Sequence, residues 1–127
     1  MNDNKNKFIL GEYYTRQQIH DVVGGELVSY LPSVNRKIVA GCFTFVLNPD
    51  LPYKILVGDA PLVVQKAKML CEQEEPIPVF SKIEKNKWEY IGCFRAKYIE
   101  DILVIQPYAF EAGRDDVVGL LVLEETK

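Results

Sequence analysis

The sequence predicts a small α+β domain, in which a mixed and mostly antiparallel β-barrel carries two short helices. The chain has 127 residues, of which 48% are hydrophobic, so it can bury one core but has no room for a second domain. Both helical patterns lie before residue 74, whereas most strand patterns follow it. Helices and strands therefore do not alternate as they would in a doubly wound α/β fold. We expect one domain over residues 1–127, with residues 1–7 disordered because they are polar and aperiodic.

The first helix is predicted between Thr15 and the glycine pair Gly24-Gly25. Thr15 and Gln18 have the spacing of a capping box, in which each side chain accepts a hydrogen bond from the other residue's backbone N–H. The glycines end the helix because they adopt the left-handed backbone conformation easily.

The second helix is predicted to begin after Asp59, whose side chain is placed to cap it, and to run to about Gln73. Pro61 falls in its first turn, where proline is tolerated because that backbone nitrogen has no helical partner. The segment Glu74-Glu75-Pro76 ends the helix.

The remaining apolar segments alternate, or are rich in β-branched and aromatic residues, which is typical of strands. Turn signals at 48–50, 85–86 and 100–101 and a longer loop over 108–116 separate them. We predict strands at 38–46, 54–57, 78–83, 88–98, 102–105 and 117–123.

The cysteines and the single histidine argue against metal or nucleophilic chemistry. Cys42, Cys71 and Cys93 are widely separated and odd in number, so we expect them to be reduced core residues of a cytoplasmic protein. His20 cannot complete a zinc ligand set of the usual spacing. Triad, phosphate-loop and dinucleotide-binding patterns are also missing from the sequence. We therefore expect no enzyme, no metal and no cofactor, and no apolar run is long enough to span a membrane.

Charge is distributed unevenly along the chain. The formal net charge of −3 argues against a protein that coats nucleic acid non-specifically. Between residues 81 and 98, however, five basic residues stand against two acidic ones, whereas between 99 and 127 two basic residues stand against seven acidic ones. Such a chain can present one basic face, or both segments can simply be solvated surfaces.

The predicted strand 88–98 places aromatic residues on alternate positions. Trp88, Tyr90, Gly92, Phe94, Ala96 and Tyr98 would form one face, and Arg95 and Lys97 belong to the other. Gly92 indicates a bulge or a close approach of a ligand or another backbone. The aromatic side chains can be core residues around a bend of the barrel. Alternatively, a planar ring stacks on Tyr90 or Trp88 while the two cations face phosphates.

A second group of functional residue types lies near the first helix. Arg16 occupies the first turn, where the helix dipole disfavours a cation, so another interaction should hold it there. A salt bridge to a carboxylate and a contact with phosphate are the two possibilities. His20 is interpreted as a partly buried side chain bonded to a backbone carbonyl, with a ligand or base role as the alternative.

These two segments resemble a known family. Residues 11–25, written G-x-x-Y-x-R-x-x-I-H-D-x-x-G-G, are similar to the opening of the SRA-like domains that precede HNH nucleases in bacterial modification-dependent restriction enzymes. Trp88-x-Tyr90-x-Gly92 is similar to an aromatic-x-Tyr-x-Gly strand of the same domains.

The resemblance implies a PUA-like β-barrel that flips a modified cytosine of DNA into a pocket. By position, Tyr14 and Arg16 would lie near the pocket mouth, Gly24 and Gly25 would permit close approach of the nucleic acid, and Tyr90 would wall the base cavity. Asp59, Asn48 and Ser29 are the candidate side chains for the edge of the base. No nuclease half accompanies these motifs.

We therefore expect a stand-alone PUA/SRA-like domain that recognises a modified base in DNA, or a similar nucleotide, in restriction or phage defence. The alternative is a protein-interaction or anti-defence module that uses its acidic C-terminal third and has no base pocket. The candidate binding residues are Tyr13, Tyr14, Arg16, His20, Gly24, Gly25, Ser29, Trp88, Tyr90, Arg95 and Lys97.

Overall fold

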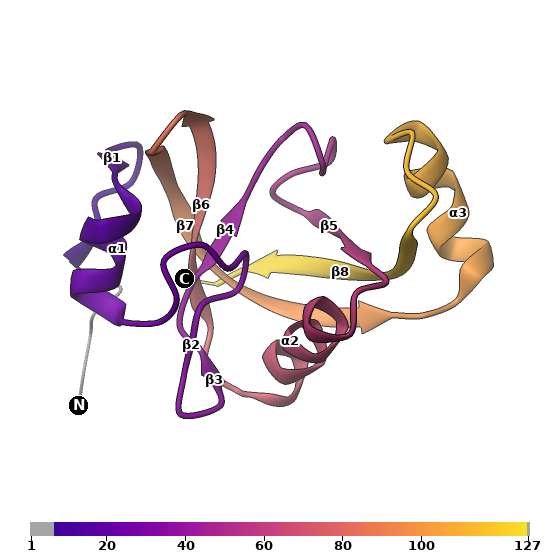
Figure 1. The fold of residues 1–127 in the computed structure, drawn as a ribbon, viewed down its shortest axis with the longest axis horizontal. Coiled ribbons are helices and arrows are strands. Elements are labelled where there is room, and N and C mark those ends of the chain that lie inside the picture. The colour runs from indigo at the N-terminus through magenta and orange to yellow at the C-terminus, as the bar shows by residue number, and fades with distance from the viewer. Residues whose placement is uncertain (1–6, 127) are drawn as a thin grey trace.

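The computed structural model describes residues 7–126, and three helices occur in this part of the chain (Figure 1). The disorder predicted for residues 1–7 falls outside the described residues, except at Lys7. No helix between residues 7 and 126 is long and apolar enough to cross a membrane. The helices are α1 (Arg16–Val23), α2 (Pro61–Glu72) and α3 (Ile102–Glu111). The strands are β1 (Tyr13–Tyr14), β2 (Ser33–Val34), β3 (Lys37–Ile38), β4 (Gly41–Phe43), β5 (Lys54–Gly58), β6 (Ile77–Glu84), β7 (Lys87–Ile99) and β8 (Val117–Glu125).

Most of the strands form one mixed sheet in the order β4-β6-β7-β8-β5, with β1 added beside the start of β7. Only β4 and β6 pair in parallel within this sheet, and β2 and β3 form a separate small hairpin. The predicted α+β class with mostly antiparallel strands is confirmed. Closure of the sheet into a barrel stays a prediction, since β4 and β5 stand at the two ends of this strand order.

A bulge in β7 changes the side of the sheet to which its even-numbered side chains point. Phe80 pairs with Tyr90 but Val79 pairs with Gly92, so Ile91 is an extra residue in β7. Gly92 has φ +126°, a conformation that L side chains rarely adopt. The bulge indicated by Gly92 is therefore confirmed.

The bulge also corrects the predicted aromatic face. Trp88 and Tyr90 join one buried cluster, whereas Phe94, with Ala96 and Tyr98 packed beside it, belongs to another. An extra residue shifts the two-residue period by one, so side chains of the same parity point to opposite sides before and after it. The single aromatic face predicted over 88–98 is wrong for this reason.

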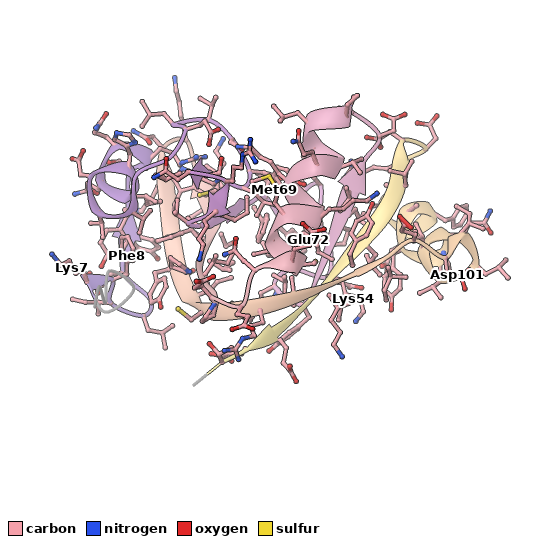
Figure 2. The ribbon with its side chains drawn as sticks, turned by 90° about the horizontal axis from the view of Figure 1, so that it is seen from below. Lys7, Phe8, Lys54, Met69, Glu72 and Asp101 are labelled. Atoms are coloured by element: carbon pink, nitrogen blue, oxygen red, sulfur yellow. The ribbon has the colours of Figure 1, made fainter. Side chains whose placement is uncertain are left out.

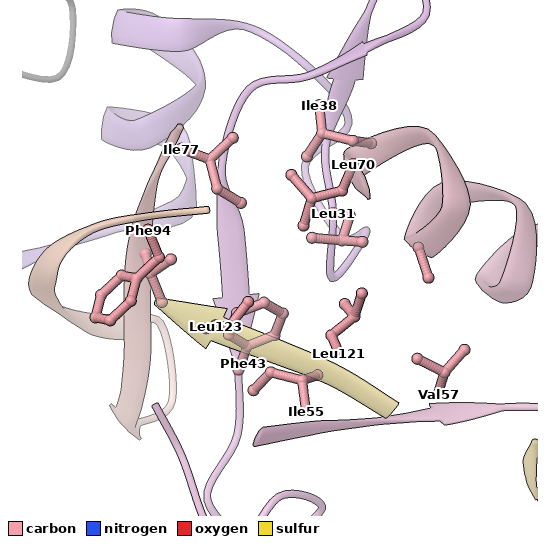
Figure 3. Close-up of a cluster of buried hydrophobic side chains, with 12 residues drawn as sticks. Leu31, Ile38, Phe43, Ile55, Val57, Leu70, Ile77, Phe94, Leu121 and Leu123 are labelled. Atoms are coloured by element: carbon pink, nitrogen blue, oxygen red, sulfur yellow. The ribbon is translucent and has the colours of Figure 1, made fainter. Parts of the chain in front are cut away.

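Three clusters of buried side chains lie against the sheet, and each includes residues of a different helix. α2 covers the largest one, which contains Phe43, Ile55, Phe94 and Leu121 (Figure 3). α1 packs with Phe8 on the cluster that holds Trp88 and Tyr90, and α3 packs on β5 and β8. α1 and α3 consequently lie at opposite ends of the molecule, as the positions of Lys7 and Asp101 in Figure 2 illustrate.

The structure corrects two predicted strands. Residues 102–105, predicted as a strand, form the first turn of α3, so the described chain has a third helix in addition to the two predicted ones. Asp101 caps this helix, because its side chain accepts a hydrogen bond of 2.9 Å from the Leu103 backbone N–H. The strand predicted at 38–46 is divided, because Ile38 ends β3, Gly41–Phe43 form β4, and residues 45–47 form a turn.

The helix starts are predicted well for α1 and less well for α2. Both hydrogen bonds of the Thr15–Gln18 capping box are present, at 2.8 and 3.1 Å, which confirms that prediction. The N-cap of α2 is Ala60 and not Asp59, and no side chain caps this helix. Pro61 lies in its first turn as expected.

Candidate functional site

A cavity of about 860 Å³ opens between the segment 26–30, the β4–β5 connection and the start of α2. Its size lies within the range of roughly 300–1,000 Å³ that is typical of small-molecule sites. Apolar side chains of several elements, among them Phe43, Leu62 and Val63, form much of its wall. Its charged lining residues are Arg16, Glu26, Asp59, Lys66, Lys82, Arg114 and Asp116, a formal excess of one positive charge.

Two cations from different helices hold the segment 26–29 at one side of the cavity. The Arg16 guanidinium donates to the carbonyl oxygens of Glu26 and Ser29, at 3.0 and 2.9 Å. Lys66 of α2, which is only 4% exposed, contacts the Glu26 carboxylate and the Ser29 hydroxyl, both at 2.9 Å. The interaction expected for Arg16 is therefore with backbone carbonyls, and neither a carboxylate nor a phosphate is needed to explain its position.

The Glu26 carboxyl group stays ionised at pH values well below the ordinary pKa of a glutamate side chain. Burial alone would raise its pKa, but hydrogen bonds from Lys66 and from the Ser33 backbone N–H lower the pKa to about 2. The Glu26 carboxylate thus remains charged over the whole physiological range, and its contact with Lys66 keeps this wall of the cavity in place.

Trp88 contributes an aromatic surface flanked by cations. Its side chain lines the cavity and is 7% exposed. The guanidinium carbon of Arg16 lies 5.3 Å from the ring centroid, and the Lys82 Nζ lies 5.8 Å from it. Arg16 is fixed by its carbonyl partners, whereas Lys82 is exposed and forms no ion pair with the described residues.

The far wall of the cavity is built around Arg114. Its guanidinium donates two hydrogen bonds, of 3.1 and 3.0 Å, to the Asp116 carboxylate and a third, of 3.3 Å, to the Leu47 carbonyl. The hydrogen bonds from Arg114 lower the pKa of Asp116 below its ordinary value. Asn48 is not free to bind a ligand with its amide, since it accepts from Leu56 N–H and donates to the Thr44 carbonyl.

The predicted binding residues are distributed over several places. Arg16, Ser29 and Trp88 meet at the cavity. Tyr14 and Tyr90 instead pack around Phe8 and Phe80, and the Tyr90 hydroxyl donates to the Cys93 sulfur at 3.7 Å. Burial raises the pKa of Tyr90 above its ordinary value. Tyr90 is thus a core residue in this structure and does not line the cavity.

His20 lies in the last turn of α1, and Gly24 and Gly25 follow the end of this helix. The His20 Nδ1 lies 2.7 Å from the Gly25 carbonyl oxygen, which confirms the backbone-bonded interpretation of this histidine. A Cβ atom on Gly25 would lie 2.6 Å from the Cβ of Pro32 and 3.1 Å from the Ser33 backbone nitrogen, so the close approach at this glycine is to residues 32–33 of the chain itself.

Tyr13, Arg95 and Lys97 lie outside the cavity wall. Lys87 covers the Tyr13 ring, with its Nζ 4.5 Å from the centroid. Arg95 donates to the Glu74 carbonyl at 3.1 Å, and Lys97 is exposed on the second half of β7. These cations do not converge with Arg16 and Trp88.

Five of the charged lining residues were not among the candidate site residues predicted from the sequence: Glu26, Lys66, Lys82, Arg114 and Asp116. Lys66 carried a usable signal, because it shares the apolar stripe of α2 with Val63, Ala67 and Leu70 at spacings of three and four. A lysine on a core-facing stripe requires a partner for its charge. Arg114 and Asp116 lie in a loop, where no periodicity marks them.

No family model matches the chain, and no curated protein and no solved structure was found to match it. Within residues 7–126 there is also no group of three or more His, Cys, Asp or Glu side chains placed to hold a metal ion. What the chain binds must therefore follow from the chemistry of the cavity itself.

Proposed function

We propose that the chain binds nucleic acid and holds one unstacked base in the cavity beside Trp88. The observation that carries this proposal is the combination of an apolar wall with four cationic side chains around one hollow of about 860 Å³. A nucleobase has apolar faces and polar edges, and it is joined to a negatively charged backbone. The apolar wall suits the faces, and Lys82, the lining cation that has no carboxylate partner among the described residues, suits a neighbouring phosphate.

Lys82 is the residue that would make room for the base. Its ammonium group lies over the Trp88 ring and has no carboxylate partner among the described residues. When the ammonium group turns out to a phosphate, the ring face becomes available for stacking. Base–aromatic stacking contributes about 1–3 kcal/mol, which offsets the few kcal/mol needed to unstack the base from a duplex.

A modified base in DNA is the proposed ligand within this class. The resemblance of residues 11–25 and 88–92 to SRA-like domains supports this choice. The apolar lining, which includes Leu62 and Val63, would accommodate an added methyl group better than water does. Asp59 and the Ser29 hydroxyl remain the candidate groups for the polar edge of the base.

Intrinsic fluorescence offers a direct test, because Trp88 is the only tryptophan of the chain. Short duplexes containing cytosine, 5-methylcytosine, 5-hydroxymethylcytosine or N6-methyladenine would be titrated into the protein at low and moderate salt. We expect one modified duplex to quench the Trp88 emission and to bind more tightly than the unmodified duplex. Its affinity should fall as salt rises, since cation–phosphate contacts release counterions.

Two variants localise the binding. Leu62→Trp would place a large ring at the cavity mouth and should abolish binding, as measured by anisotropy of a labelled duplex. Lys82→Gln should weaken binding, whereas Lys85→Gln, a control on the same hairpin outside the cavity wall, should not. Failure of every duplex to bind at low salt would overturn the proposal, and so would full affinity in the Leu62→Trp variant.

A further inference from the structure

The outward face of α3 is apolar although it is exposed. Leu103 is 77% exposed and Phe110 is 86% exposed, and Ile102 is also exposed. A hollow of about 590 Å³ lies beside these side chains and is lined by α3 and the start of β8. Contiguous exposed apolar surface of this kind usually marks an interaction site.

The spacing of residues along α3 shows that this apolar surface is additional to its packing face. Ile105, Tyr108, Ala109 and Ala112, at spacings of three and four residues, pack on β5 and β8 in one buried cluster. Leu103, Pro107 and Phe110 repeat with the same spacing on the opposite side. A surface helix is normally polar on that side, so a helix that is apolar all round is expected to be covered on both sides.

The surroundings of the exposed face are acidic. Glu100 and Asp101 precede α3, Glu111 ends it, and Asp115 lines the neighbouring hollow. No lysine or arginine occurs between residues 99 and 113. Arg114 also lines this hollow, but its guanidinium is engaged by the Asp116 carboxylate and the Leu47 carbonyl.

Two lysines of other elements approach the inner side of α3 and its start. Lys54 lies over the ring of Tyr108, with its Nζ 5.4 Å from the centroid, and Lys68 lies 3.6 Å from the Glu100 carboxylate. The partners of these two lysines are thus Tyr108 and Glu100, and not the exposed residues Leu103 and Phe110. The outward face therefore keeps acidic groups at both of its ends.

We propose that the outward face of α3 docks a segment of a partner protein in which large apolar side chains are flanked by lysine or arginine. Apolar side chains of the partner would cover Leu103 and Phe110, and its cations would meet Asp101, Glu111 and Asp115. Nucleic acid is a poor occupant because its phosphates would face these carboxylates. A symmetric pair of two α3 helices would place acidic groups against acidic groups. This interaction is independent of the base-binding cavity.

The test uses a labelled amphipathic peptide of leucine and lysine at helical spacing, added to the full chain and followed by anisotropy. We expect saturable binding that weakens about tenfold or more in Leu103→Ser and Phe110→Ser, the effect typical of removing a central anchor. The double variant Glu111→Lys/Asp115→Lys should also lose binding. Leu10→Ser, at a residue that is 67% exposed and follows Phe8 at the α1 end of the molecule, serves as the matched control and should bind normally.

Several results would overturn the proposal. The first is failure of the wild-type chain to bind the peptide. The second is equally tight binding of a leucine–glutamate peptide, and the third is full affinity in the α3 variants. Sedimentation velocity adds a further arm: wild-type dimers that Leu103→Ser converts to monomers would assign the face to a second copy of the chain. Duplex binding measured on Leu103→Ser separates this test from the proposed function, because that variant should leave the cavity unchanged.

Discussion

Lys66 illustrates how a single buried charge organises one wall of the cavity. Removing an ammonium group from water is costly, and here the Glu26 carboxylate and the Ser29 hydroxyl offset that cost. Glu26 is half-exposed, so it keeps part of its own hydration while serving as the partner. Together with Arg16, this pair fixes the segment that carries Leu27 and Val28 at the cavity mouth.

Glu26→Gln should reveal this pair through the pH dependence of stability. Hydrogen bonds lower the pKa of Glu26 in the folded chain from 4.5 to about 2. Its contribution is therefore fully present above pH 4.5 and is lost as pH falls toward 2. We expect Glu26→Gln to be less stable than wild type in urea unfolding at pH 7, by about 1–3 kcal/mol. The variant leaves the buried Lys66 ammonium group without its counter-charge, although solvent screens the half-exposed Glu26 side of the pair.

Stability measured at acidic pH provides the check on that interpretation. The difference between wild type and Glu26→Gln should shrink as pH falls between 4.5 and 2. Glu12→Gln, at an exposed carboxylate that makes no ion pair within residues 7–126, is the control and should show no such convergence. A constant difference at all pH values would assign the effect to packing and not to the charge.

At the scale of elements, the two helix starts that contain Asp differ in a measurable way. Asp101 accepts a hydrogen bond from Leu103 N–H, whereas the N-cap of α2 is Ala60, which follows Asp59. Asp101→Ala should therefore cost about 1 kcal/mol of unfolding free energy, the usual effect of losing a capping side chain. Asp59→Ala should change stability by no more than a few tenths of that in the same urea titration. Equal losses in the two variants would contradict the assigned caps.

The elements that were predicted correctly carry local signals. The capping box of Thr15 and Gln18 defines α1, and β-branched and aromatic runs define most of β5, β6, β7 and β8. The four apolar residues 102–105 were mistaken for a strand because a run of that length fits a buried strand and a helical turn equally well. Asp101 immediately before this run was the local sign of a helix start.

The site was predicted less well than the elements. Arg16, Ser29 and Trp88 were chosen from two segments and do meet at the cavity. Tyr90 was expected beside them, but it packs against Phe8 and Phe80 in the cluster under α1. The contact with Phe8 comes from a segment far away in the sequence, which no local pattern predicts. Arg114 reaches the cavity through a loop contact with Leu47, and no pattern in one sequence predicts such a contact.

The backbone conformation of Gly92 in the β7 bulge predicts that one added methyl group there will lower the stability of the fold. Gly92 has φ +126°, and an added Cβ would lie 3.1 Å from the Glu125 carboxylate oxygen. Gly92→Ala should destabilise the chain by about 1–3 kcal/mol, because backbone strain and contact act together. Gly11→Ala is the control for strain alone, since φ is +85° there but no atom of residues 7–126 lies within 4 Å of the added Cβ. Thermal unfolding of both variants measures the difference, and a smaller loss at Gly92 would exclude the contact.

For the molecule as a whole, β7 is the strand that connects the separate clusters. One edge of β7 pairs with β6, and the other pairs first with β1 and then with β8. Trp88 and Tyr90 lie in the cluster under α1, Phe94 lies in the cluster under α2, and Ile99 packs against the cluster under α3. The bulge reverses the alternation of side chains along β7, so Trp88 and Tyr90 before it and Phe94 after it belong to different clusters although all three are even-numbered.

Native-state hydrogen exchange should reflect this central position. The amides of β7 and of its partners in β6 and β8 should open only with global unfolding, because their hydrogen bonds lie between buried clusters. α3 contains a single fully buried side chain, Ile105, so its amides should exchange by local opening at least about tenfold faster, a difference of about 1.4 kcal/mol. Residue-resolved exchange measured by NMR would test this order. Protection of the α3 amides equal to that of β7 would show that the helix and the sheet unfold as one unit. In a second measurement, a basic peptide bound to Leu103 and Phe110 should raise the protection of the α3 amides selectively.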